Sequence, residues 1–280
     1  MTEFALGLPC TRADCASRRW ERRLRVKWAV WVWLGAMLTL MSGAGRAEGE
    51  TPSRPVFTVL VLQNSPYMSY HNEDGVLVGF NVEVGRLLCR KLKVHCEIRQ
   101  TLLADIVDKV ASGEADIGIA SLTVTPERAK RVLFTVPYMR GNTFWVGRSA
   151  PAASTGPIRV AAVNGSTQHD WVLQQSVQHG WTVTPVKLNA ELADALVDKR
   201  VDAVVAPIAS AMNIMKRTEL SQAGFALHPL EAEVLRGPLS IALNPAHRAL
   251  LEPVNRIIQD IQQDGQLDRI NSRYFPFRVF

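Results

Sequence analysis

Short apolar runs alternate with stretches of helical periodicity along most of the chain. The runs predict strands at residues 57–62, 76–80, 94–99, 115–120, 158–163, 181–186 and 201–206. Between the runs, apolar residues recur at the spacing of an amphipathic helix. This spacing predicts helices at residues 81–92, 102–111, 167–177, 190–199 and 249–272. Strands that alternate with helices in this way are typical of an α/β fold.

A segment rich in small residues and proline, 148–156, precedes the second series of strands and helices. The two series are similar in plan, but no sequence repeat of the kind that marks solenoid proteins relates them. A chain of 280 residues is long for one hydrophobic core and short for three. We therefore expect one or two domains.

The N-terminal segment has the pattern of an export signal. Basic residues at 18–27 precede an apolar run at 28–41, and small residues follow at Gly45 and Ala47. This order is typical of a cleaved signal peptide. A retained membrane anchor is the alternative, but the run is shorter than the roughly 20 residues that span a bilayer. We expect cleavage after Ala47, so that residues 1–47 are removed and the mature chain lies in the periplasm.

The net charge of +6 is concentrated in the predicted signal peptide. Of the 32 basic and 26 acidic residues, eight and three respectively lie at 1–47, which leaves 24 and 23 in the mature chain. A nearly neutral body offers no basic surface for nucleic acid or for an anionic membrane. We expect neither as a partner.

Two cysteines, Cys89 and Cys96, remain in the predicted mature chain. An even number of cysteines in an oxidising compartment favours a disulfide. A zinc site is the alternative, but two thiols with His95 nearby make an incomplete ligand set. We expect the disulfide, and no cofactor.

Hydroxyl-bearing residues and an arginine follow the predicted strand at 115–120. Ser121 and Thr123 lie in the loop, and Thr125 is the expected N-cap of a short helix that carries Arg128 in its first turn. Hydroxyls and main-chain N–H groups at a helix start favour an anion, and an arginine adds a fork for a carboxylate. The alternative is that the hydroxyls only cap the loop and that Arg128 is a solvated surface charge.

A second strand-to-helix turn follows the predicted strand at 158–163. Gly165 allows the turn, and the N–H groups of Ser166 and Thr167 are expected to point outward at the helix start. The alternative is a simple helix cap, in which Thr167 pairs with Asp170. Two such turns, one in each βα series, suggest two halves that face one ligand.

Six short motifs follow one another along the mature chain with consistent spacing. They are Gly75–Glu83 (GVLVGFNVE), Ser112–Asp116, Thr123–Val132, Phe134–Tyr138, Gly165–Gln168 and Asp264–Leu267. With these motifs the chain resembles the polar amino-acid class of periplasmic solute-binding proteins, which feed ABC importers. The Cys89–Cys96 spacing is also similar to a disulfide of the basic amino-acid binders in this class.

The resemblance implies a periplasmic-binding-protein-like α/β fold of two Rossmann-like lobes joined by two hinge strands. Lobe one is expected at 56–140 plus 238–280 and lobe two at 144–233, in a monomer that closes on its ligand like a Venus flytrap. The resemblance further implies that Arg128 pairs with the α-carboxylate of the ligand. Its other expected contacts are Ser121, Thr123 and the N–H groups of Ser166 and Thr167.

The chain departs from the family pattern at the amino-binding half of the site. The acid that holds the α-ammonium in the family aligns with Pro207, and the stacking aromatic aligns with Asn64 or, with a shifted turn, Tyr67. A second stacking aromatic aligns near Leu103. A buried ammonium without an anionic partner costs on the order of several kcal/mol. Either an acid from another loop supplies the charge, or the ligand has no α-amino group; we favour the second.

The function expected from these residues is binding without catalysis. The protein would bind a small carboxylate-bearing solute, an amino acid or a related organic acid, and deliver it to an ABC permease. One alternative is a periplasmic accessory or sensory protein that acts on a protein partner. A second is an enzyme, because a cyclohexadienyl dehydratase resembles this family; the acid-free segment 206–208 disfavours it and leaves His169 as the candidate general acid.

Overall fold

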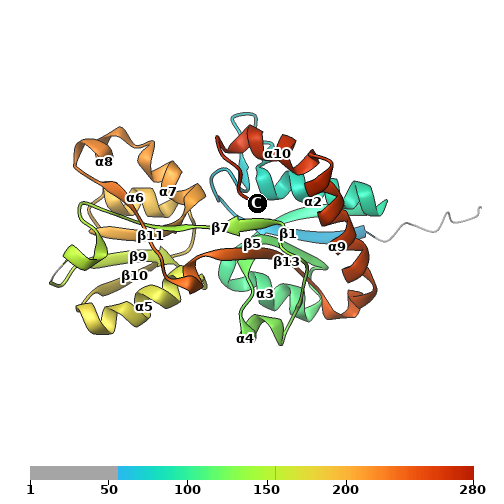
Figure 1. Cartoon of the computed structure of the whole chain (residues 1–280), viewed down its shortest axis with the longest axis horizontal. Coiled ribbons are helices and arrows are strands. Elements are labelled where there is room, and N and C mark those ends of the chain that lie inside the picture. The colour runs from blue at the N-terminus through green and yellow to red at the C-terminus, as the bar shows by residue number, and fades with distance from the viewer. Residues whose placement is uncertain (1–55, 155) are drawn as a thin grey trace, which may run out of the picture. The chain divides into compact units, whose positions relative to one another are not determined.

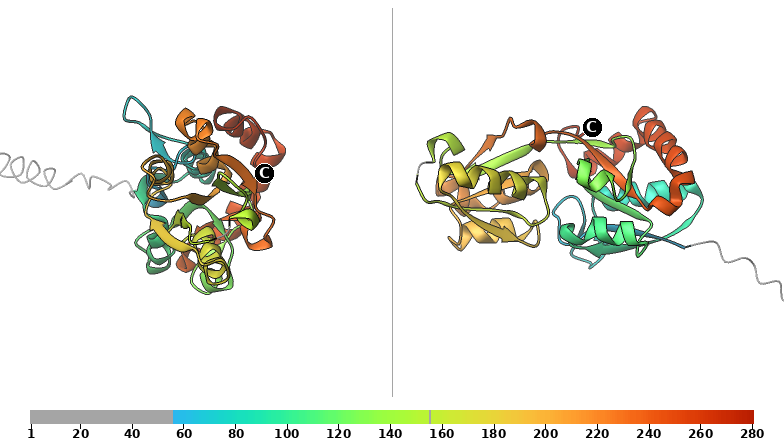
Figure 2. Two further views of the ribbon diagram at one scale, coloured as in Figure 1. Left: turned by 90° about the vertical axis from the view of Figure 1, so that its left-hand side faces the viewer. Right: turned by 90° about the horizontal axis from the view of Figure 1, so that it is seen from below.

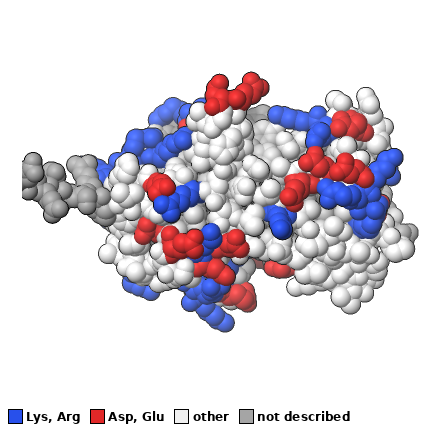
Figure 3. Space-filling model, turned by 180° about the vertical axis from the view of Figure 1, so that it is seen from behind, with Lys and Arg blue, Asp and Glu red and all other residues white. Residues whose placement is uncertain are grey.

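The computed structural model describes residues 56–154 and 156–280. The predicted signal peptide and its cleavage after Ala47 lie outside the described residues. Within the described ranges, no helix is long and apolar enough to cross a membrane. On the face shown in Figure 3, basic and acidic side chains are interspersed over the surface, in keeping with the small net charge of this part of the chain.

The first lobe is built on a six-stranded sheet in the order β4-β1-β5-β13-β6, with β7 paired to β13. β1 is parallel to β4 and β5, whereas β13 is antiparallel to β5, β6 and β7. The strands are β1 Val56–Leu62, β4 His95–Thr101, β5 Ile117–Thr123, β6 Leu133–Phe134, β7 Met139–Gly141 and β13 Gly237–Leu243. The helices are α2 Phe80–Leu92, α3 Leu103–Ser112, α4 Pro126–Ala129, α9 Arg248–Gln263 and α10 Gln266–Tyr274, and a small ribbon pairs β2 Tyr70–His71 with β3 Leu77–Val78.

Alternate residues of the central strands face opposite sides of the first sheet. Val59 and Ile117 are buried in the cluster that includes α2, α9 and α10. Leu60 and Leu122 are buried in a second cluster with Ile106 of α3. Helices thus cover both sides of this sheet (Figure 1), which explains why its strands read as continuous apolar runs.

The second lobe is built on a five-stranded sheet in the order β10-β9-β11-β8-β12. β9 is parallel to β10 and β11, and β8 is antiparallel to β11 and β12. The strands are β8 Thr143–Gly147, β9 Arg159–Val163, β10 Thr182–Val186, β11 Ala203–Pro207 and β12 Ala226–Pro229. The helices are α5 Thr167–His179, α6 Glu191–Val197, α7 Ile208–Met215 and α8 Thr218–Gln222, with 3-10 turns at Pro151–Ala153 and Glu233–Leu235. A third 3-10 turn, Pro245–His247, precedes α9 in the first lobe.

The chain passes between the two sheets twice. The first crossing leads from β7 through Asn142 into β8, and the second leads from β12 through residues 230–236 into β13. β7 and β13 are hydrogen-bonded neighbours, so the two crossings run side by side (Figures 1 and 2). The architecture is therefore the expected one of two α/β lobes joined by two hinge strands, while the lobe bounds of 56–140 plus 238–280 and 144–233 stay a prediction.

The C-terminal helix predicted at 249–272 is wrong as a single element. The structure has two helices, α9 and α10, separated at Asp264 and Gly265. Gly265 adopts a left-handed conformation with φ 73°, and the Asp264 carboxylate accepts the N–H of Gln266 over 2.9 Å. Because only glycine takes this φ at little cost, the chain turns here even though the apolar periodicity continues.

The predicted disulfide is confirmed. Cys89, near the end of α2, is bonded to Cys96 in β4, with 6.1 Å between the Cα atoms. The bridge ties the helix to an edge strand of the first sheet. No group of three or more His, Cys, Asp or Glu side chains that could hold a metal occurs at 56–154 or 156–280.

Candidate ligand-binding site

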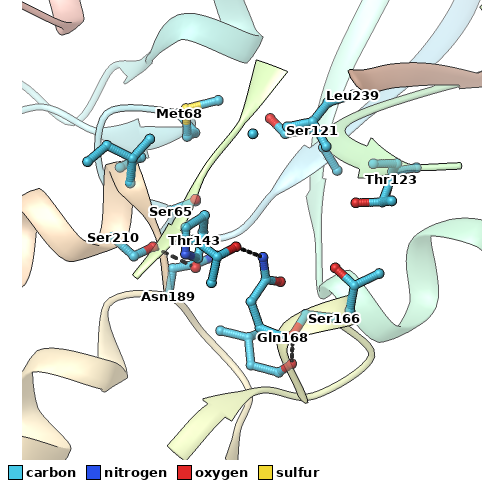
Figure 4. Close-up of a pocket in the computed structure, with 18 of the residues that line it drawn as sticks. Ser65, Met68, Ser121, Thr123, Thr143, Ser166, Gln168, Asn189, Ser210 and Leu239 are labelled. Carbon is cyan, nitrogen blue, oxygen red and sulfur yellow. Dashed lines mark hydrogen bonds between the residues drawn. The ribbon is translucent and has the colours of Figure 1, made fainter. Parts of the chain in front are cut away.

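A pocket lies between the two sheets, beyond the carboxyl ends of β1, β5, β9 and β11 (Figure 4). Both lobes contribute to it, and the space inside is about 90 Å³. Its polar lining includes Ser65, Asn81, Ser121, Thr123 and Arg128 from the first lobe and Thr143, Ser166, Thr167, Gln168, Asn189 and Ser210 from the second. Carboxyl ends of strands are the usual place for ligands in open α/β sheets.

Arg128 reaches from α4 to both lobes. Thr125 caps this short helix and accepts the N–H of Arg128 over 3.3 Å, as the sequence predicted. The Arg128 guanidinium donates to the main-chain oxygens of Thr123 and Gly165, each over 2.9 Å. A guanidinium has further N–H groups in its fork, and these remain free to bind an anion.

Burial lowers the pKa of the Arg128 guanidinium, and the nearby charge of Asp170 opposes this effect. An arginine still keeps its proton under such conditions because its ordinary pKa is so high. Arg128 therefore places a permanent, partly desolvated positive charge in the pocket wall. An anion that enters the pocket would compensate the cost of that desolvation.

Ser121 is held at the end of β5 by a buried network. Its main-chain φ is 53°, an uncommon value for a residue with a side chain. The Ser121 N–H donates to the Tyr138 hydroxyl over 3.0 Å, and this hydroxyl donates to Asn81 Oδ1 over 2.7 Å. The Asn81 amide in turn donates to Ser121 Oγ over 3.3 Å. Tyr138 is fully buried, and desolvation raises the pKa of its hydroxyl, so the group stays a hydrogen-bond donor.

Ser166 caps α5, in place of the Thr167 cap considered from the sequence. Its Oγ accepts the N–H of His169 over 3.0 Å and donates to the oxygen of Val163 over 2.6 Å. The Ser166 N–H also donates to Val163, over 3.1 Å, so it is already engaged within the turn. Thr167 opens the helix, where N–H groups have no intrahelical partner. Both residues line the pocket.

Asn64 and Tyr67, the two residues that align with the stacking aromatic of the family, do not line this pocket. The oxygen of Asn64 accepts the N–H of Ala190 in the second lobe over 3.3 Å. The Tyr67 ring packs against Phe275 at 5.9 Å between centroids, and Lys216 of the second lobe lies 4.8 Å from its centre. Phe275, from the C-terminal segment, is the aromatic residue that lines the pocket.

Polar residues of the second lobe complete the wall, and the sequence did not single them out. The Ser210 hydroxyl of α7 donates to Asn189 Oδ1 over 2.7 Å, and the Gln168 amide donates to Thr143 Oγ1 over 2.9 Å (Figure 4). No motif marks Asn189 or Ser210, because a lone polar residue in a loop or a helix is common in any sequence. Gln168 was visible only as the last residue of the Gly165–Gln168 motif.

The pocket contains no negative side chain. None of its lining residues is Asp or Glu, and all of them belong to the described part of the chain. Pro207, at the end of β11, lines the pocket between Val205 and Ile208. A second cation, Arg236, lies at its edge; this residue is exposed and forms an ion pair with Glu231.

A family model of the bacterial extracellular solute-binding proteins, family 3, matches residues 57–277. The chain is 24% identical to the ABC transporter arginine-binding protein 1 of Escherichia coli K12, over 71% of this chain and 82% of that protein. It is 27% identical to the L-cystine-binding protein TcyJ of the same organism, over 75% and 79%. An ancestral arginine-binding protein bound to arginine shares the fold at a TM-score of 0.70, with 27% identity over 80% of this chain and 99% of that one.

The matched region spans both lobes and nearly all of the described residues. The relatives are amino-acid-binding proteins, one of them named as part of an ABC transporter, as the motif resemblance predicted. The chain belongs to the bacterial extracellular solute-binding proteins, family 3.

Proposed function

We propose that this protein binds a small carboxylate-bearing solute, an amino acid or a related organic acid, in the pocket between its lobes. The observation that carries the proposal is the partly desolvated guanidinium of Arg128, which lines the pocket and keeps N–H groups free. The hydroxyls of Ser121 and Thr123 and the first turn of α5 at Thr167 lie in the same wall. A carboxylate satisfies this combination of a fixed cation, hydroxyls and helix N–H groups.

The binding step is hinge closure. A ligand that contacts residues of both lobes favours the conformation in which the lobes approach each other. Arg128 already bridges the lobes through Gly165, so a carboxylate on its guanidinium would lie beside the start of α5. The arginine-binding relative is named as an ABC transporter protein, and we place this protein in the periplasm as a monomer that delivers its solute to a permease.

The names of the relatives support an amino-acid-like acid, because those proteins bind arginine and cystine. The pocket lining has one feature that matters for such ligands. A second positive group on the ligand would find no carboxylate among the lining residues. Arginine itself is therefore a poor candidate, and the family name does not decide the ligand.

A catalytic function is less well supported. Dehydration of a cyclohexadienyl acid needs a group that transfers a proton to the leaving oxygen. No acidic side chain lines the described pocket, and His169 does not line it either. A sensory or accessory role is compatible with the same pocket, since a solute that closes the lobes would change the surface a protein partner meets.

Ligand identification tests the proposal. The purified protein is examined by native mass spectrometry, and a thermal-shift panel then compares amino acids with oxo, hydroxy and dicarboxylic acids. A true ligand raises the melting temperature in proportion to the logarithm of its concentration over the dissociation constant. The proposal requires that a carboxylic acid stabilises the protein and that the Arg128→Ala variant loses the effect. Stabilisation that is equal in the variant would contradict it.

A further inference from the structure

The charges around the pocket select against a ligand with an ammonium group. Arg128 supplies a positive charge to the wall, Arg236 lies at the edge, and no lining residue is negative. The carboxylate of an amino acid could pair with Arg128, but its ammonium would lie a few bonds away without an anionic partner. Neutral acceptors such as Gln168 Oε1 cannot compensate a desolvated positive charge fully.

A largely buried amide, that of Asn189, lines the same pocket as Arg128. Asn189 is 7% exposed and Ser210 is 1% exposed, and both line the pocket. The Ser210 hydroxyl occupies Asn189 Oδ1, and in the described part of the chain the Asn189 amide nitrogen has no hydrogen-bond partner. A primary amide nitrogen only donates. An oxygen of the ligand satisfies this donor, whereas an ammonium group is repelled by it.

Pro207 cannot provide an anionic contact for a ligand ammonium group. It ends β11, lines the pocket and has no side-chain acceptor. The adjacent N–H, that of Ile208, donates to the oxygen of Asn142 over 2.9 Å and is thus not free. At the end of β11 the pocket wall is therefore formed by an uncharged proline ring.

The rest of the lining suits a short apolar chain. Leu62, Met68, Leu103, Leu239 and Phe275 contribute apolar surface. The pocket is partly open and has a volume of about 90 Å³. A ligand with an apolar chain would pack against these side chains.

We propose that the solute is a 2-oxo or 2-hydroxy monocarboxylic acid with a short apolar chain, and that the unpartnered Asn189 amide, the hydroxyl of Ser210 and the proline at 207 select its oxygen over an amino group. The inference rests on the proposed function, because it takes the carboxylate to be bound by Arg128. It adds the chemical identity of the ligand group on the carbon beside the carboxylate. The acid is held at one end by the guanidinium and at the next carbon by the Asn189 amide.

Matched pairs of acids test the inference by isothermal titration calorimetry on the mature protein. Pyruvate is compared with L-alanine, 3-methyl-2-oxobutanoate with L-valine and 4-methyl-2-oxopentanoate with L-leucine, together with the 2-hydroxy acids. Members of a pair differ only in the group beside the carboxylate. We expect an oxo or hydroxy acid to bind at least about a hundredfold more tightly than its amino acid, the ratio that follows from an unpaired buried charge.

Two variants test the residues. Pro207→Asp places a carboxylate in the wall, and we expect it to raise affinity for the amino acids and lower affinity for the oxo acids, each by at least about tenfold. Pro207→Asn introduces a side chain of the same shape as aspartate but without its charge. It controls for the loss of proline and should not gain amino-acid binding. Asn189→Asp replaces the donor by an oxygen and should weaken oxo-acid binding, whereas the same change at Asn213 of α7, outside the pocket lining, should not.

Melting temperatures show whether each variant is folded. Failure of this inference and failure of the proposed function give different results. An amino acid that binds the wild type as tightly as its oxo acid, through Arg128, overturns this inference and leaves the proposed function in place. If no acid of either series binds, this inference fails; the proposed function fails as well if no acid of the wider thermal-shift panel stabilises the protein. Unchanged oxo-acid affinity in Asn189→Asp removes Asn189 from the selection and overturns the inference as stated.

Discussion

The Arg128 guanidinium donates a hydrogen bond to the main-chain oxygen of Gly165 over 2.9 Å, and these two residues belong to different lobes. Arg128 also donates to Thr123, within its own lobe. One side chain thus joins the end of β5 to the turn before α5. The group that we propose as the carboxylate anchor is therefore positioned by both halves of the protein before any ligand is considered.

Replacement of Arg128 tests the anchor. Arg128→Ala should weaken acid binding by about ten- to a hundredfold or more, because a hydrogen bond to a charged group contributes roughly 1.5–3 kcal/mol. Arg128→Lys keeps the charge but not the planar fork, and it should recover only part of the affinity. Calorimetry measures both variants. Wild-type affinity in Arg128→Ala would remove the carboxylate assignment.

The Cys89–Cys96 bridge should contribute to stability and not to binding. It closes a short loop between α2 and β4, with a sequence separation of 7 residues. Chain-entropy reasoning gives about 2–3 kcal/mol for a loop of this length. The double variant Cys89→Ser, Cys96→Ser should lose about that much free energy of unfolding in a urea titration.

The same double variant provides its own control, because neither cysteine lines the pocket. Its affinity for the ligand at 25 °C should equal that of the wild type within about twofold. A large loss of affinity with an unchanged free energy of unfolding would contradict the prediction that the disulfide contributes to stability and not to binding.

Removal of the Tyr138 hydroxyl should destabilise the protein and loosen the site. Tyr138→Phe leaves Asn81 Oδ1 and the Ser121 N–H without their partner in a buried setting. A buried group left unsatisfied costs about 1–3 kcal/mol. We expect a loss of that size in chemical unfolding, and a several-fold weaker affinity because Ser121 loses the contact that holds its uncommon backbone conformation.

Tyr274→Phe is the matched control for this prediction. Its hydroxyl accepts the N–H of Gly79 over 3.2 Å and donates to Glu83, and it lies outside the pocket lining. The control should affect stability without affecting ligand affinity. Equal effects of the two variants on affinity would show that the site does not depend on Ser121.

The contact between Lys216 and Tyr67 should favour closure of the lobes. The Lys216 ammonium lies 4.8 Å from the centre of the Tyr67 ring. A cation–π contact of this kind contributes about 0.5–1 kcal/mol at an exposed site. Lys216→Met keeps the length of the side chain and removes the charge, so ligand affinity should fall by about two- to fivefold.

The variant Lys199→Met controls for the general loss of a positive charge, since Lys199 lies in an exposed turn after α6. Calorimetry compares the two, and small-angle X-ray scattering with and without ligand reports the extent of closure. Identical affinities in Lys216→Met, Lys199→Met and the wild type would exclude a contribution of this contact.

Local sequence was sufficient for much of the architecture. The apolar runs at β1, β5 and β11 are long enough and bounded clearly enough that they predict buried strands without tertiary information. The cap at Thr125 was also predictable, because an N-cap depends on residues within one turn of the helix. The α9–α10 break was missed, since the apolar stripe continues across Gly265 while the backbone turns.

The sequence by itself thus determined the alternation of strands and helices that marks an α/β fold, the family and the disulfide, because each depends on short-range pattern or on motif order. The tertiary structure decided which side chains share the pocket. Asn189 and Ser210 lie on different elements and meet only when α7 packs against the loop before α6. Likewise, Tyr67 has a φ of 63°, packs on Phe275 and does not line the pocket. Long-range packing sets such orientations, and no local pattern encodes them.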